Sequence, residues 1–109
     1  KSAVCAGLLT LMEEESLPPS AVRRFVIAGG FGNTMNTDSA KEIGLFPAAL
    51  REHTAFIGNG ALGGACMLLM NCGLREKSEQ IAREAVELSL SASARFMDCY
   101  VDCMSFMEF

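Results

Sequence analysis

Two glycine clusters carry the clearest chemistry in this sequence. They are Ala28-Gly29-Gly30-Phe31-Gly32-Asn33 and Gly58-Asn59-Gly60-Ala61-Leu62-Gly63, and each follows a short apolar run. Glycine has no side chain to hold a ligand off the backbone, so the N–H groups of such a turn can face a phosphate or a ribose. The first cluster fits a tight turn that needs a positive φ equally well.

The second cluster matches the G-x-G-x-x-G spacing of a dinucleotide-binding turn. The rest of that unit does not follow, because no further strand comes after the helix expected over 61–72, and no acidic residue ends a strand about 20 residues on. Glu79 and Glu84 fall in a polar helical segment instead. The sequence therefore favours glycines that let a helix pack closely on a strand over a Rossmann turn.

The other reactive side chains form no catalytic or metal-binding pattern. None of the five cysteines belongs to a C-x-x-C pair, and an iron–sulfur cluster takes a full set of cysteines at short spacings. Cys99 and Cys103 share one helical face, and we expect free, buried thiols in a reducing compartment. His53 is expected in a solvated loop, and the chain contains no G-x-S-x-G, H-E-x-x-H or G-K-[ST] motif.

Composition bounds the class of protein. Of the 109 residues, 50% are hydrophobic and 20% are charged, with a formal net charge of −4. This excludes disorder and argues against a nucleic-acid binder, and without a run of about 18 apolar residues we expect no membrane span. The apolar content is high for so short a chain, which predicts a surface that meets a neighbour. The chain also starts at Lys1, almost inside a helix pattern and without a signal peptide, which suggests a segment of something longer.

The elements that position these groups follow from apolar spacing and from glycine and proline stops. We expect helices over 3–14, 38–43, 61–72, 75–87 and 93–105, a helical turn at 48–51, and strands at 25–28 and 54–57. The expected N-caps are Ser2 and either Thr37 or Asp38, and the expected stops are Gly44 and Gly73. Strands that alternate with helices predict an α/β fold with a parallel pair.

Side-chain patterns add expectations about packing. The first helix carries Val4, Leu8, Leu11 and Met12 at helical spacing and is expected to pack on one face of the sheet. The helix over 75–87 is expected to bury Ile81, Ala85 and Leu88 and to pair Glu79 with Arg83, although Val86–Leu90 is also compatible with a strand.

Taken together, these residues resemble a known family. The segments that carry the resemblance are Phe25-Val26-Ile27-Ala28-Gly29-Gly30-Phe31-Gly32-Asn33, Asn36, Ile43-Gly44-Leu45-Phe46-Pro47, Phe56-Ile57-Gly58-Asn59 and Leu62-x-Gly64-Ala65. They are similar to the C-terminal part of the ATP-dependent reductive activators of corrinoid proteins, which contain a nucleotide-binding core of the actin/Hsp70/sugar-kinase superfamily. The resemblance covers essentially the whole chain and departs at its end, Met107-Glu108-Phe109.

The resemblance implies a fold and a site. The fold would be a partial RNase H-like α/β subdomain over 1–109, with few short, mostly parallel strands and about five helices. The residues matching the adenosine motif are Gly29, Gly30, Phe31, Gly32 and Asn33. In the family, the phosphate loops, the metal-binding acidic residue and the iron–sulfur ligands lie in segments absent here, and none of the cysteines matches a cluster ligand. The resemblance therefore implies that this chain alone binds nucleotide weakly or not at all and lacks ATPase and reductase activity.

The resemblance also implies a cellular role. Full-length relatives are cytoplasmic proteins that use ATP, with Mg, to drive the reduction of an inactive Co(II) corrinoid protein to Co(I). Their electrons come from an iron–sulfur cluster in a different domain. Two alternatives stay open. One is another ATPase of the superfamily, such as one that acts on sugars or one that activates an acyl-CoA reductase. The other is a non-catalytic module that forms a homo-oligomer through an exposed sheet edge.

Overall fold

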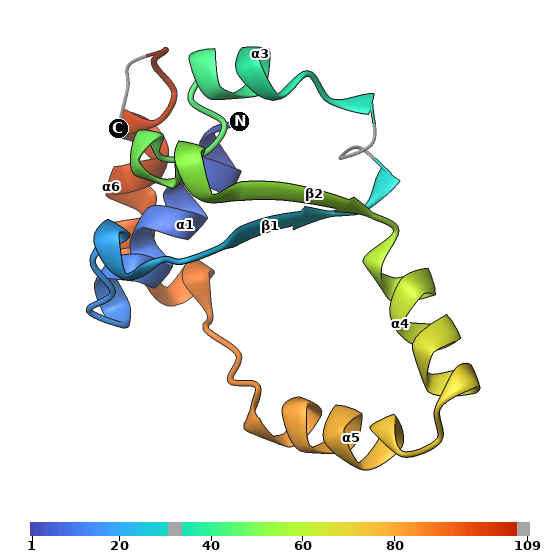
Figure 1. The fold of residues 1–109 in the computed structure, drawn as a ribbon. Coiled ribbons are helices and arrows are strands. Elements are labelled where there is room, and N and C mark those ends of the chain that lie inside the picture. Colours follow the sequence, from blue (N-terminus) through green and yellow to red (C-terminus); the bar gives the residue numbers. More distant parts are fainter. Residues whose placement is uncertain (31–33, 107–109) are drawn as a thin grey trace.

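Two short parallel strands lie at the centre of the chain (Figure 1). β1 (Phe25–Ala28) and β2 (Thr54–Gly58) pair from Phe25 opposite Thr54 to Ala28 opposite Gly58, with an irregularity after Ile27. The computed structural model describes residues 1–30 and 34–106, without the side chains of residues 37 and 51. Within those residues, five α-helices accompany the two-stranded sheet, so the expected α/β fold with a parallel pair is confirmed.

The connection between the strands contains α3 (Thr37–Glu42) and the 3-10 turn η2 (Ala48–His53). The cap expected at Thr37 or Asp38 is wrong, because α3 begins after Asn36, whose Oδ1 accepts a hydrogen bond from the Ser39 N–H at 2.9 Å. Gly44, with φ +66°, follows the helix where a stop was expected. The connection then brings Phe46, which is 1% exposed, back to β1. The centroids of the Phe46 and Phe25 rings lie 5.3 Å apart.

α1 (Ser2–Glu14) packs against α6 (Ala94–Asp102), which brings residues far apart in the sequence side by side (Figure 1). Their shared core contains Cys5, Ala6, Cys99 and Cys103. The buried face of α1 differs from the expected apolar stripe. Val4 is 50% exposed, while the small residues Cys5 and Ala6 are buried against α6. Small side chains let the two helices approach closely, and α6 therefore packs on the face of α1 that contains Cys5 and Ala6.

Lys1 joins the start of α1 to the end of α6. α1 has Lys1 rather than Ser2 at its N-cap, without a side-chain capping bond. The Lys1 side chain reaches across to α6, where Nζ donates hydrogen bonds to the carbonyl of Cys103, at 2.6 Å, and to that of Ser105. A cation there meets the negative end of the α6 dipole, which stabilises the helix pair.

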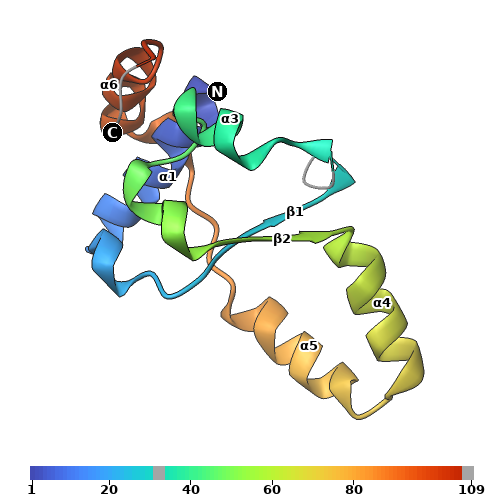
Figure 2. The ribbon, with the colours of Figure 1, turned by 45° about the horizontal axis from the view of Figure 1, so that its top comes forward.

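α4 (Gly60–Met70) and α5 (Leu74–Glu84) extend from the sheet as an arm, called here the α4–α5 arm (residues 60–84) (Figures 1 and 2). The expected close packing of α4 on the strands is wrong, because none of its residues is buried. A Cβ at Gly63 or Gly64 would meet nothing within 4 Å. Of these three glycines in α4, Gly60 alone has close neighbours: a Cβ built on it would lie 3.2 Å from Ile57 Cδ1, where the arm begins.

α5 also differs from the expected packing. Ile81 is 60% exposed, Ala85 ends the helix and Leu88 lies beyond it, so the expected buried stripe is wrong. The expected pair of Arg83 with Glu79 is confirmed at 3.4 Å.

Asn71 shapes the turn between α4 and α5. Gly73 precedes α5 instead of ending α4, because Asn71 ends α4 and its Oδ1 accepts the Gly73 N–H at 3.0 Å. The segment 86–90 forms no strand, and a 3-10 turn, η3 (Leu90–Ala92), leads into α6.

Two threonines give a matched test of this packing. The Thr10 hydroxyl is buried and has no hydrogen-bond partner among the described residues, whereas Thr54 Oγ1 donates to the Leu50 carbonyl at 2.8 Å. Removing an unpaired buried hydroxyl relieves its desolvation cost, so we expect Thr10→Val to raise the free energy of unfolding by about 1 kcal/mol and Thr54→Val to lower it by about 1 kcal/mol. Urea unfolding measures both, and a loss of stability in Thr10→Val would contradict the packing described for α1.

Candidate functional site

The carboxyl ends of β1 and β2 meet at one edge, which is where ligands bind open parallel sheets. There the Gly29 N–H donates to the Gly58 carbonyl at 2.6 Å and joins the two strand ends. Gly29 has φ +111° and Gly58 has φ +63°, both in the left-handed region that L side chains rarely adopt. At Gly29 and Gly58, therefore, the backbone itself requires glycine.

Gly30 differs from Gly29 in a way that bears on function. Its φ is not in the left-handed region, and a Cβ built on it would meet nothing within 4 Å. No contact within the described residues therefore calls for glycine here, and none of those residues fills the space beside this peptide. A flat ligand group can approach the backbone of Gly29 and Gly30 without a side chain between them. Phe31, Gly32 and Asn33, the other expected nucleotide contacts, lie outside the described residues.

The N-terminus of α4 lies at the same edge, directly after β2. Asn59 caps it, with Oδ1 accepting the Leu62 N–H at 3.0 Å. The sequence expectations missed this cap, although an asparagine before a helical run is a recognised N-cap signal. The positive end of the α4 dipole therefore adds to the backbone donors at this edge.

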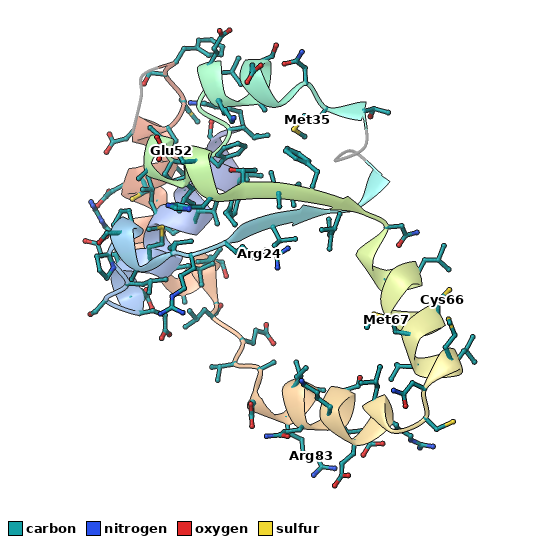
Figure 3. The ribbon with its side chains drawn as sticks, viewed as in Figure 1. Arg24, Met35, Glu52, Cys66, Met67 and Arg83 are labelled. Carbon is teal, nitrogen blue, oxygen red and sulfur yellow. The ribbon has the colours of Figure 1, made fainter. Side chains whose placement is uncertain are left out.

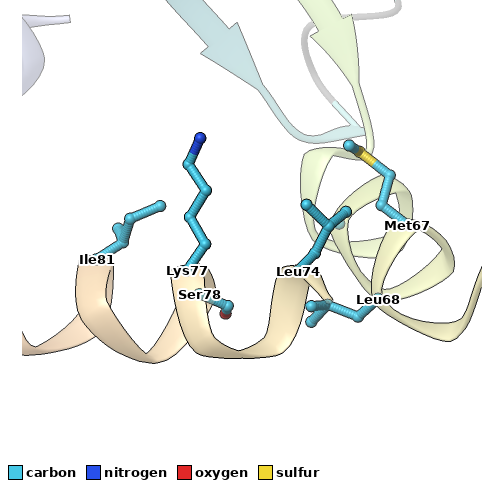
Figure 4. Close-up of a pocket in the computed structure, with 7 residues that line it drawn as sticks. Met67, Leu68, Leu74, Lys77, Ser78 and Ile81 are labelled. Carbon is cyan, nitrogen blue, oxygen red and sulfur yellow. The ribbon is translucent and has the colours of Figure 1, made fainter. Parts of the chain in front are cut away.

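An apolar groove lies on the α4–α5 arm rather than at the sheet edge (Figure 4). It has a volume of about 350 Å³, and Met67, Leu68, Leu74 and Ile81 supply its apolar wall, with Lys77 beside them. Met67 points from α4 toward the sheet, whereas Cys66 lies on the outer side of the helix (Figure 3). The groove offers an apolar contact surface and no pair of groups arranged for proton transfer.

The cysteines divide into two groups. Cys5, Cys99 and Cys103 are buried between α1 and α6, as expected, but Cys66 and Cys72 are exposed because the arm does not pack on the sheet. Burial, followed by the hydrogen bond with Cys103, raises the pKa of the Cys5 thiol to about 12. Such a thiol stays protonated and unreactive near neutral pH.

The remaining acidic and histidine side chains are spread apart within the described residues. No group of three or more His, Cys, Asp or Glu side chains within residues 1–30 and 34–106 is placed to hold a metal ion. His53 is exposed, as expected, although it ends a 3-10 turn rather than lying in a loop. In the part of the chain that the structure describes, no helix is long and apolar enough to cross a bilayer.

Known proteins match almost the whole chain. A family described as the C-terminal domain of RACo, the ASKHA domain, matches residues 1–108. The corrinoid activation enzyme RamQ of Eubacterium limosum is 31% identical over 101 residues, which are 93% of this chain and 17% of RamQ. A solved structure of a reductive activator for corrinoid, iron-sulfur protein has a TM-score of 0.83 and 36% identity, and the match covers 92% of this chain and 16% of that chain. The chain thus spans about a sixth of the length of these relatives.

We expect the two adjacent glycines to respond differently to the same substitution. Gly29→Ala forces an alanine to φ +111° and is expected to lower the free energy of unfolding by about 1–3 kcal/mol. Gly30→Ala meets no neighbour and no such strain, so we expect a change within about 0.5 kcal/mol. Urea unfolding of both variants measures the difference, and equal losses would show that the turn is not built as described.

The buried thiol predicts how stability depends on pH. The pKa of Cys5 is raised from 9.0 to about 12, so the folded state holds this proton more tightly than the unfolded state does. The stability that the folded state gains from keeping the Cys5 thiol protonated is therefore complete below about pH 9 and is lost as the pH rises toward 12. We expect the urea midpoint to fall over this range, and to fall less steeply in Cys5→Ala. Identical pH profiles would mean that Cys5 titrates as an ordinary exposed thiol.

Proposed function

The chain belongs to the family of the RACo C-terminal, ASKHA domain, and from that premise we propose that its Gly29–Gly30 turn contacts an adenine nucleotide. The observation that carries the proposal is the open space over Gly30, where nothing within the described residues calls for the absence of a side chain. Phe31, Gly32 and Asn33 extend the same turn in the sequence and belong to the proposed site.

The residues at this edge fit one part of a nucleotide better than another. Apart from the Gly29 N–H and Asn59 Oδ1, which already bond within the chain, Gly29 and Gly30 supply peptide groups and Asn59 an amide NH₂, which suit the hydrogen bonds of a base or ribose. Mg²⁺ is held by carboxylate and phosphate oxygens, and we propose that the ligands of an ATP-bound Mg²⁺ come from elsewhere in the full polypeptide. The role of this chain is then to orient the adenosine end of ATP or ADP.

We further propose that the whole protein acts on a corrinoid protein. The relatives are a corrinoid activation enzyme and a reductive activator for corrinoid, iron-sulfur protein, and these descriptions favour this role over that of other ATPases of the superfamily. In this proposal the hydrolysis of bound ATP supplies the free energy for reducing Co(II) to Co(I). The electrons come from an iron–sulfur cluster outside this chain, and the protein works in the cytoplasm.

A bulky side chain at the turn tests the proposal. In the longest polypeptide that the gene encodes, Gly30→Val is expected to weaken binding of labelled ATP and ADP at least about tenfold, which corresponds to about 1.4 kcal/mol. Gly64→Val is the matched control, because its Cβ also meets nothing within 4 Å but lies in the α4–α5 arm. ATP-dependent formation of Co(I), followed by the absorption of the corrinoid, should fall with nucleotide affinity. Unchanged affinity in Gly30→Val would remove this turn from the site.

A further inference from the structure

Three buried cysteines meet where α1 packs against α6. Cys5 and Cys103 are 0% exposed and Cys99 is 4% exposed, and all three belong to the same core cluster. Cys5 lies near the start of α1, whereas Cys99 lies within α6 and Cys103 directly follows that helix. The cluster therefore joins the two ends of the chain, and the proposed nucleotide site uses none of its thiols.

Cys5 and Cys103 are already paired across the helix interface. Their thiols share a hydrogen bond, so the two sulfur atoms face each other. A disulfide requires two cysteines on neighbouring backbones whose side chains point toward one another. Lys1 helps to hold these backbones together, because its Nζ donates a hydrogen bond to the Cys103 carbonyl at 2.6 Å. The hydrogen bond singles out Cys103, rather than Cys99, as the partner of Cys5.

A small oxidant has two routes to this cluster. Cys99 lines an open hollow of about 290 Å³ between α1 and α6, together with Leu9 and Arg95. Cys103 is the C-cap of α6, and the terminal turns of helices open more readily than their interiors. Hydrogen peroxide is close to water in size, so it fits these routes better than a bulky disulfide such as oxidised glutathione does.

The two thiols of the pair have different roles in the oxidation. Burial raises the pKa of Cys5 to about 12, so Cys103 supplies the thiolate that attacks peroxide. That attack breaks the O–O bond, leaves a sulfenic acid on Cys103 and releases hydroxide. The Cys5 sulfur then displaces the sulfenic oxygen, which leaves as water with the Cys5 proton. In total, two thiols lose two electrons and one peroxide is reduced to two waters.

We propose that peroxide joins Cys5 to Cys103 in a reversible disulfide that fixes the start of α1 to the end of α6. Disulfides of cytoplasmic proteins are usually transient and respond to oxidation, which fits the proposed cellular setting. The bond closes a loop of nearly the whole chain, so it stabilises the folded state by restricting the unfolded one. Thiols reduce the bond and restore the pair. The proposal does not depend on nucleotide binding.

Peptide mapping identifies the bond in the unsubstituted protein. The longest polypeptide that the gene encodes is treated with hydrogen peroxide, alkylated in urea and digested without reduction. Chymotrypsin cleaves after Tyr100, which places Cys99 and Cys103 in different peptides. We expect the peptide that contains Cys5 to be linked to the one that contains Cys103, and dithiothreitol to separate them.

Other results of this mapping would overturn the proposal. A link from Cys5 to Cys99 would show that the hydrogen bond does not select the partner. A link between two molecules, increasing with protein concentration, would place the reaction outside the α1–α6 interface. The exposed Cys66 reports whether the oxidant has acted. Free Cys5 and Cys103 after Cys66 has been oxidised would show that peroxide does not join the pair.

Urea unfolding measures the effect of the bond on stability. Peroxide should raise the urea midpoint by about 1 M in the unsubstituted protein and in Cys99→Ala, and should not raise it in Cys103→Ala. Cys99→Ala is the matched control, because it removes a thiol of the same cluster and leaves the pair intact. Equal rises in both variants would assign the effect to another bond and contradict the proposal. The peptide map uses the unsubstituted protein and does not depend on how either variant folds.

Discussion

The hydrogen bond from the Gly29 N–H to the Gly58 carbonyl is the contact on which the candidate site depends. It closes the carboxyl edge of a sheet that has only one pair of strands among the described residues. Both glycines have positive φ, so the chain can leave both strands sharply at the same place. The turn at Gly30 and the N-terminus of α4 consequently lie at one edge, and a single ligand there can meet both.

Outside the candidate site, side chains are buried only where another part of the described chain covers them. Phe46 and Leu50 are buried beside one end of β1, and α1 and α6 bury their small residues against each other. The α4–α5 arm buries none of its residues, although α4 is apolar on all sides. A helix of that kind is normally found inside a larger core. Exposed large apolar side chains are thus found along the arm, and also on α6 and just beyond it, at Met97, Val101, Met104 and Phe106.

The sequence predicted the elements better than their packing. Strands at 25–28 and 54–57 were predictable because apolar runs end in glycine, and the parallel pairing followed from the helices between them. The exposure of Cys66, Ile81 and Leu11 was not predictable, because an apolar residue indicates that burial is favourable without indicating which surface would cover it. At the candidate site, both clusters follow the carboxyl ends of the strands as expected, but only backbone angles separate Gly29, where φ is positive, from Gly30, where it is not.

Amide chemical shifts show whether a nucleotide lies over the Gly29–Gly30 turn. The polypeptide that the gene encodes is labelled with [¹⁵N]glycine and titrated with ADP, and the glycine amide signals are followed. We expect the Gly29 and Gly30 signals to shift with saturation while those of Gly63 and Gly64, in the α4–α5 arm, stay in place. Shifts confined to Gly63 and Gly64 would place the nucleotide on the arm and exclude it from the turn.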